Sequence, residues 1–180
     1  MVKFVKPELD EVFKMKNITK SVSIVLTAIY SFMVIWIILF KMSTLSEITY
    51  LDHIRNINLI PFHYDVERSY HLSEVLKNVM FFIPLGVYFK MLRFTNAKAI
   101  LFGMTFSLSL EILQFILAVG ATDITDIITN TTGTAIGVGI YSLLALVFRK
   151  REKLDKLLCI LASICTILFI SFMAILLLAN

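Results

Sequence analysis

Two long apolar runs without any charge constrain the fold of this chain most. Residues 21–40 and 157–178 hold no charged side chain over 20 and 22 positions. Each residue of an α-helix adds about 1.5 Å, so about 20 apolar residues cross the roughly 30 Å hydrocarbon layer of a bilayer. Both runs therefore predict transmembrane helices. The hydrophobic content of 58% also exceeds that of ordinary soluble domains.

Three further apolar stretches predict helices at residues 75–92, 99–120 and 124–148. We therefore expect an all-α, polytopic integral membrane protein with about five transmembrane helices. The stretch at 75–92 is the least regular, because Pro84 and Gly86 interrupt it. A full helix and a kinked or partly re-entrant one both remain open for this segment.

The basic residues predict the orientation of the chain. With five spans and a cytoplasmic N-terminus, 13 of the 17 basic residues lie on the cytoplasmic side, and only Lys41, Arg55, Arg68 and Lys77 lie outside. Because Lys and Arg favour cytoplasmic loops, we expect the N-terminus in the cytoplasm and the C-terminus outside the cell.

This topology divides the chain into three parts. Residues 1–20 form a cytoplasmic segment, in which apolar residues at helical spacing predict an interfacial helix. Residues 21–148 form a membrane domain of four spans with an extracellular loop near 41–74. Residues 149–180 form a basic cytoplasmic loop and the fifth helix.

Several function classes lack support. The formal charge of +4 comes from short basic clusters between apolar runs, so no nucleic-acid partner is expected. Cys159 and Cys165 have no metal-ligand spacing and are interpreted as lipid-facing or packing residues. The three histidines match no zinc motif, and no hydrolase signature is present.

Two stripes of small and polar residues mark the third and fourth predicted helices, at spacings of three and four residues that put each stripe on one helix face. The stripes are Gly103, Ser107, Glu111, Gln114 and Ala118, and Asp123, Asp126, Asn130, Gly133 and Gly137. A short connection makes these helices antiparallel neighbours, so we expect the stripes to face each other. Counting back from the connection places Gln114 level with Asn130 and Glu111 near Gly133. Gly133 and Gly137 predict close helix packing.

Glu111 is the most informative residue of the stripes. A carboxylate at the centre of a bilayer costs about 2.5 to 3.5 kcal/mol on insertion scales, so something must compensate it. Gln114, Asn130, the Ser107 hydroxyl, a bound cation or a proton could each do so. A protonated Glu111 that only links helices is the structural alternative.

Asp123 and Asp126 stand at the start of the fourth helix, where aspartate caps backbone N–H groups. Capping explains one of them more readily than both, since Asp126 continues into the stripe. With Glu111, these carboxylates are candidate ligands of a divalent cation such as magnesium or calcium. The other candidates for an ion or ligand pocket are Gln114, Asn130, Asn58, Asn78 and Arg55.

Four motifs together resemble the VanZ-like family. They are NLIPF at 58–62, NVMFFIPLG at 78–86, EILQ at 111–114 and DITDIITNTTGTAIG at 123–137. The resemblance covers about residues 21–148 and implies a multi-pass protein of the bacterial plasma membrane. It marks Asn58, Pro61, Phe62, Asn78, Pro84, Gly86, Glu111, Gln114, Asp123, Asp126, Asn130 and Gly133. Many relatives carry an arginine before the first aspartate, where this chain has Gly120 and Ala121, so Arg55 or an external cation would have to replace that charge.

The resemblance implies a contribution to resistance against teicoplanin, a lipid-tailed glycopeptide. We expect action at the outer leaflet through an acid and amide pocket, with membrane lipid and lipoglycopeptide as partners. Three alternatives remain open: an enzyme acting on lipid-linked cell-wall precursors, a proton- or cation-linked transporter, and a structural or partner-binding membrane protein.

Overall fold

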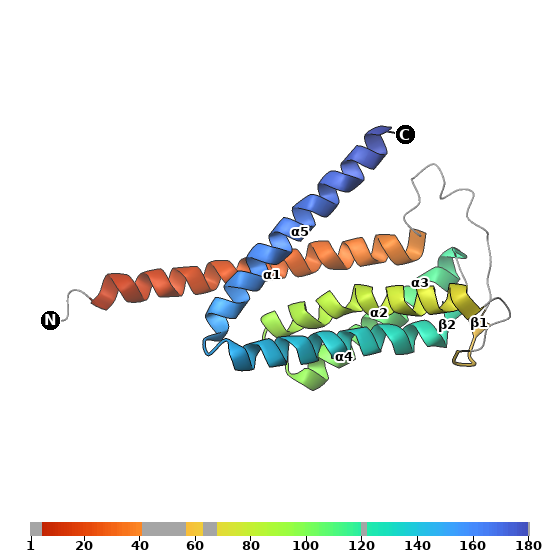
Figure 1. Cartoon of the computed structure of the whole chain (residues 1–180), viewed down its shortest axis with the longest axis horizontal. Coiled ribbons are helices and arrows are strands. Elements are labelled where there is room, and N and C mark those ends of the chain that lie inside the picture. Colours follow the sequence, from red (N-terminus) through yellow and green to blue (C-terminus); the bar gives the residue numbers. More distant parts are fainter. Residues whose placement is uncertain (1–4, 41–56, 63–67, 120–121, 180) are drawn as a thin grey trace.

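The computed structural model describes residues 5–40, 57–62, 68–119 and 122–179, and side chains at 17–39, 57–62, 72–119 and 122–175. Within these residues the chain forms five helices and two strands of two residues each (Figure 1). They are α1 (Val5–Phe40), β1 (Ile57–Asn58), α2 (Arg68–Met91), α3 (Asn96–Leu117), β2 (Thr122–Asp123), α4 (Ile124–Val147) and α5 (Arg151–Ala179). The five predicted helices are confirmed.

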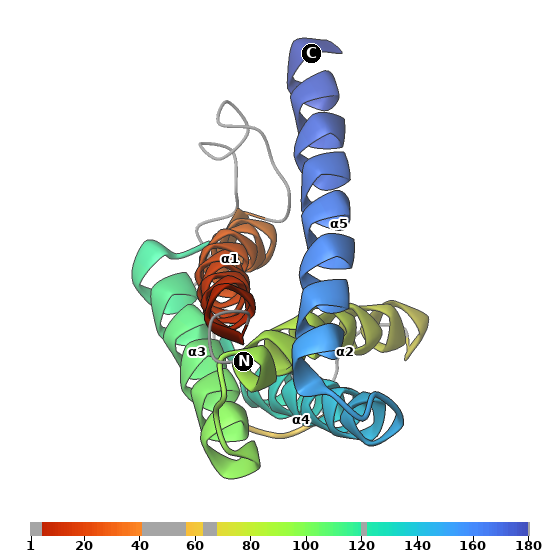
Figure 2. The ribbon, with the colours of Figure 1, turned by 90° about the vertical axis from the view of Figure 1, so that its left-hand side faces the viewer.

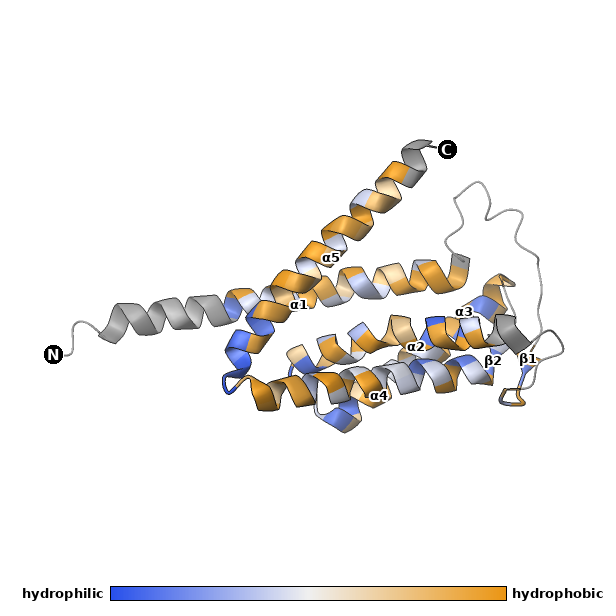
Figure 3. Cartoon of the chain, viewed as in Figure 1, coloured by the Kyte–Doolittle hydropathy of each residue, from blue (hydrophilic) through white to orange (hydrophobic). Residues whose placement is uncertain are grey.

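All five helices are long and apolar enough to cross a membrane. Figure 3 shows hydrophobic residues along α1 and α5 and hydrophilic residues at the turn into α5 and near the strands. This distribution is the one that a bilayer requires, because polar groups lose hydration energy in hydrocarbon. The protein is therefore an all-α, multi-pass membrane protein.

Two helices differ from their predicted extents. α1 is continuous from Val5, so the predicted interfacial segment continues directly into the first span. α2 also runs unbroken through Pro84. A proline removes a backbone donor and weakens the helical hydrogen bonds just before it. The Tyr30 hydroxyl on α1 donates to the Phe81 carbonyl at 3.0 Å in this weakened turn.

Glycines bring α2 and α4 into direct backbone contact. A Cβ at Gly86 would clash with the Thr134 carbonyl oxygen, and one at Gly137 would clash with the Ile83 carbonyl oxygen. A Cβ at Gly133 would meet the Val79 carbonyl in the same way. Gly133 and Gly137 therefore pack helices, as predicted, but against α2 rather than within the facing stripes of α3 and α4.

The apolar core follows this central pair of helices. Phe82, Leu85 and Phe89 of α2 form one buried cluster with Leu110 of α3 and Val34 of α1. Figure 2 looks along the bundle and shows α1 and α3 beside α2 and α4. The core thus fills the space that four of the helices enclose.

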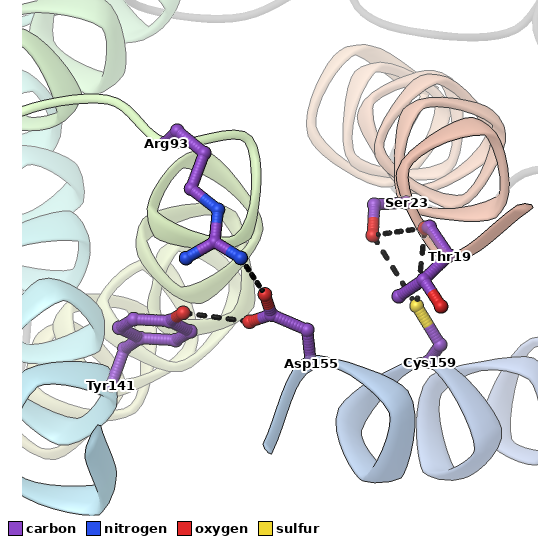
Figure 4. Close-up of polar contacts among 6 residues, drawn as sticks. All are labelled: Thr19, Ser23, Arg93, Tyr141, Asp155 and Cys159. Atoms are coloured by element: carbon purple, nitrogen blue, oxygen red, sulfur yellow. Dashed lines mark hydrogen bonds and ion pairs between the residues drawn. The ribbon is translucent and has the colours of Figure 1, made fainter. Parts of the chain in front are cut away.

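α5 is attached mainly through its first turns. Asp155, which is 4% exposed, accepts hydrogen bonds from Arg93 Nη2 and from the Tyr141 hydroxyl, both at 2.6 Å (Figure 4). One turn later, Cys159 Sγ lies 3.3 Å from Ser23 Oγ of α1. Beyond its crossing with α1, α5 extends away from the other helices (Figures 1 and 2).

Gly137→Ala tests the backbone contact between α2 and α4. The new methyl group must push the Ile83 carbonyl aside, which we expect to destabilise the protein by about 1 to 3 kcal/mol. The matched control is Gly139→Ala, since a Cβ at Gly139 meets no atom within 4 Å. Thermal unfolding of the purified protein in detergent measures both, and equal transition temperatures would contradict the assignment.

Candidate functional site

Most of the predicted site residues meet where α3 ends, α4 begins and β1 attaches. β1 and β2 pair in parallel, with Ile57 opposite Thr122 and Asn58 opposite Asp123 (Figure 1). This pairing ties the NLIPF segment to the start of α4, across more than 60 residues of sequence. The sequence predicted both segments as functional but did not predict the strands.

Asp123 is the N-cap of α4 and also anchors the NLIPF segment. Its Oδ1 accepts the Thr125 N–H at 2.7 Å, and its Oδ2 accepts the Asn58 side-chain amide at 3.0 Å. The backbone of Asp123 is extended, with φ −123° and ψ 127°, as an N-cap requires. The predicted capping role is therefore confirmed, and the same carboxylate carries a second contact.

Glu111 is 1% exposed, and its carboxylate is held by the start of α4. Its Oε2 accepts the backbone N–H of Asp123 at 2.9 Å. The Thr122 hydroxyl donates to the backbone carbonyl of Glu111 at 3.2 Å. The positive end of the α4 dipole favours a negative charge at this point. The Asp123 N–H and this dipole supply part of the compensation that a carboxylate within a transmembrane helix needs.

Counting residues back from the connection between α3 and α4 gave the wrong depth for Glu111 and Gln114. Glu111 lies beside Asp123 rather than Gly133, and Gln114 donates to the Ile38 carbonyl of α1 at 3.4 Å rather than lying opposite Asn130. The cause is the path of the chain after α3. Ala118 adopts a left-handed conformation, with φ 55°, and β2 runs back alongside the last turns of α3.

The stripes of α3 and α4 do face each other, as predicted. The Asn130 side-chain amide donates to Ser107 Oγ at 2.9 Å, and both residues are buried. One turn further on, a Cβ at Gly103 would clash with the Thr134 side chain. The two helices therefore meet through alternating polar and small residues, in a register about two turns away from the predicted one, because Asn130 lies opposite Ser107 and not Gln114.

α2 adds a second pair of amide and carboxylate side chains. Asn78 Nδ2 donates to Asp126 Oδ1 at 2.8 Å, just as Asn58 donates to Asp123. All four of these side chains are half-buried, so they form a rim around the buried Glu111. The sequence named every member of the two pairs, but not the pairing.

Two buried oxygen atoms have no hydrogen-bond partner within the described part of the chain. They are Gln114 Oε1 and Asn130 Oδ1. Buried polar atoms are nearly always paired, because an unpaired one costs about 1 to 3 kcal/mol. Gln114 and Asn130 therefore each retain the capacity to accept a further hydrogen bond.

Sequence reasoning missed Thr125. This side chain is 1% exposed, and its hydroxyl accepts the Phe62 backbone N–H at 3.0 Å. Phe62 has a φ of 56°, in the left-handed region that large side chains rarely adopt, so this bond helps to hold a strained backbone. The available signal was the position of Thr125 between the two aspartates.

Glu111, Asp123 and Asp126 were also predicted as candidate metal ligands. Glu111 interacts electrostatically with Asp126 and Asp123, but the described residues contain no group of three His, Cys, Asp or Glu side chains that could hold a metal ion. The magnesium or calcium hypothesis thus gains no support from the described part of the chain and stays a prediction. The remaining candidate, Arg55, lies outside the described residues.

Comparison with known proteins agrees with the motifs. The VanZ/LLP1 family model matches residues 27–149. Protein VanZ of Enterococcus faecium is 37% identical over 153 residues, which cover 82% of this chain and 89% of that protein. No solved structure matches the chain. The family match and the five helices of membrane-spanning length together establish that the chain belongs to the VanZ/LLP1 family of multi-pass membrane proteins.

Proposed function

We propose that this protein contributes to teicoplanin resistance by binding the lipid-tailed glycopeptide at the outer leaflet of the bacterial plasma membrane. The proposal places the β1 and β2 end of the bundle outside the cell, as the distribution of basic residues predicts. It also rests on the similarity to Protein VanZ. A lipid-tailed glycopeptide has a polar head and a hydrocarbon chain, so its site must offer both kinds of surface.

The observation that carries the proposal is the placing of a polar rim next to an apolar loop. The rim is formed by Asn58, Asn78, Asp123 and Asp126, whose half-buried side chains remain partly accessible. The loop that follows Asn58 exposes Leu59, Ile60 and Phe62, with relative exposures of 69%, 60% and 55%. Exposed apolar side chains next to a membrane surface favour contact with lipid or with a lipid tail.

The polar rim suits hydrogen-bond donors and positive charge on the ligand. Its carboxylates, Asp123 and Asp126, each repel the carboxylate of Glu111, so a donor or cation that approaches them relieves this repulsion. The unpaired oxygens of Gln114 and Asn130 are buried, on the same helix faces as Glu111 and Asp126. None of the described contacts gives comparable support to an enzyme acting on cell-wall precursors or to an ion-coupled transporter.

The carboxylate of Asp126 provides the first test. Asp126→Asn keeps the size of the side chain and removes its charge, and we expect a roughly tenfold or larger loss of teicoplanin resistance, since a hydrogen bond to a charged group is worth about 1.5 to 3 kcal/mol. We expect Glu111→Gln to act in the same direction. Inhibitory concentrations in a susceptible host, at matched expression, measure the effect, and Glu152→Gln at the other end of the bundle is the control.

A charge exchange separates ligand contact from scaffolding. The double variant Asn78→Asp with Asp126→Asn keeps one amide and one carboxylate facing each other but moves the charge from α4 to α2. If Asp126 contacts the ligand, the exchange fails to restore resistance. Full resistance in both Asp126→Asn and the exchanged variant would show that the polar rim plays no part in teicoplanin resistance.

The apolar loop provides the second test. Leu59→Asn and Ile60→Asn replace exposed side chains, so we expect little change in unfolding temperature but a clear loss of teicoplanin resistance, because each removes apolar surface from a lipid-tail contact. Val147→Asn, which alters an exposed apolar residue at the far end of α4, is the matched control. Resistance that persists in both loop variants would contradict a lipid-tail contact at this loop.

A further inference from the structure

An apolar groove lies between α1, α2 and α5, away from the polar rim. It has a volume of about 450 Å³ and is open to one side. Met33 of α1, Pro84 and Val87 of α2, and Leu158 and Phe169 of α5 are among its lining side chains. The Tyr30 hydroxyl at its wall is already used by the Phe81 carbonyl. Tyr88 and Thr166 also line the groove, but nearly all of its accessible surface is apolar.

The surroundings of the groove determine what enters it. All three of its walls are helices of membrane-spanning length and composition, and α5 leaves the bundle beyond the groove (Figures 1 and 2). Water would find too few hydrogen-bond partners in such a space, whereas hydrocarbon chains surround it at high concentration. An acyl chain is thus the physically favoured occupant.

The end of the groove nearest the turn between α4 and α5 is basic. On α5, Arg151, Asp155, Leu158, Ala162 and Cys165 follow steps of four and three, so one helix face leads from Arg151 into the groove. On α2, Met91 lines the groove, and Arg93 follows two residues later.

Positive charges outnumber carboxylates at this end of the groove. The positive charges are Arg93, Arg151 and Lys90, and the carboxylates are Asp155 and Glu152. Arg93 Nη2 binds Asp155 at 2.6 Å, as Figure 4 shows, yet its side chain remains 44% exposed. A guanidinium has five N–H donors, so it can hold a carboxylate and a phosphate together. Arg151 is exposed, and it interacts electrostatically with Lys90 and Tyr141. This end of the groove therefore carries an excess of positive charge.

We propose that the groove binds an anionic phospholipid, with an acyl chain against α1, α2 and α5 and the phosphate at Arg93 and Arg151. The lipid fills the wedge that α5 leaves beside α2, and its headgroup bridges the two helices already joined by the ion pair of Arg93 and Asp155. The site is separate from the polar rim and does not depend on the proposed role in resistance.

Cys165 allows the acyl-chain site to be tested in the unaltered protein. Cys165 lines the groove and is exposed, whereas Cys159 is buried. In the detergent-purified full chain, added phosphatidylglycerol should slow alkylation of Cys165 by a maleimide, and phosphatidylcholine should act only at roughly tenfold higher concentration, since it lacks net negative charge. The matched control is Cys165→Ser with Ile164→Cys, which places the thiol at an exposed neighbouring position that does not line the groove.

Native mass spectrometry of retained lipid tests the two halves of the site separately. Ala162→Phe should displace phosphatidylglycerol by filling the groove, whereas Ile167→Phe, which lies outside the lining, should not. Arg151→Gln should remove the preference for phosphatidylglycerol over phosphatidylcholine. Lys153→Gln, an equal loss of charge on the opposite face of α5, should leave the preference intact.

Several results would overturn the proposal. They are equal protection by the two lipids, equal protection at positions 164 and 165, and retention of lipid by Ala162→Phe. Protection that depends on protein concentration without added lipid would instead assign the groove to a second copy of this chain. Because the two lipids are compared on the unaltered protein, a variant that fails to fold does not prevent a decision.

Discussion

Close backbone contact between α2 and α4 determines where the other parts of the protein lie. Gly86, Gly133 and Gly137 let the two helices approach until carbonyl oxygens occupy the space of missing side chains. In a membrane, where apolar side chains gain little by leaving lipid, such close packing is a main source of helix association. The contact also sets the register that brings Asn78 of α2 to Asp126 of α4.

The polar cluster follows from that register and from the cost of polar groups in hydrocarbon. Each carboxylate of the cluster accepts a hydrogen bond from a different segment. Glu111 uses the backbone of β2, Asp123 uses the NLIPF segment, and Asp126 uses α2. The cluster therefore links four parts of the chain, so the positions of its side chains are supported by the whole bundle.

The two ends of the bundle differ in chemistry. One end combines acidic and amide side chains with an exposed apolar loop, and the other combines arginine and lysine with the base of an apolar groove. At the second end, the carboxylate of Asp155 accepts hydrogen bonds from both Arg93 and Tyr141. These bonds attach α5, which is otherwise poorly packed. An asymmetry of this kind matches the different surfaces that the two leaflets present.

The sequence by itself determined the class of the protein and most members of the polar cluster. Long runs of apolar residues predict transmembrane helices reliably, because each span of a bilayer needs about 20 of them. Helical spacing likewise identified the faces that carry Glu111, Asn130 and the glycines, because side chains three and four residues apart lie together whatever surrounds them. Short motifs of the VanZ-like family added Asn58 and Asn78.

Only the tertiary structure decided which faces meet and at what level. Spacing identifies a face but not its partner, so Gly133 and Gly137 could not be assigned to α2, nor Asn130 to Ser107, before the helices were packed. The reversal at Ala118 moved Glu111 to the start of α4, because one left-handed residue redirects the chain without any hydropathy signal. The two-residue strands and the groove beside α5 depend on contacts between distant segments, which no local pattern encodes.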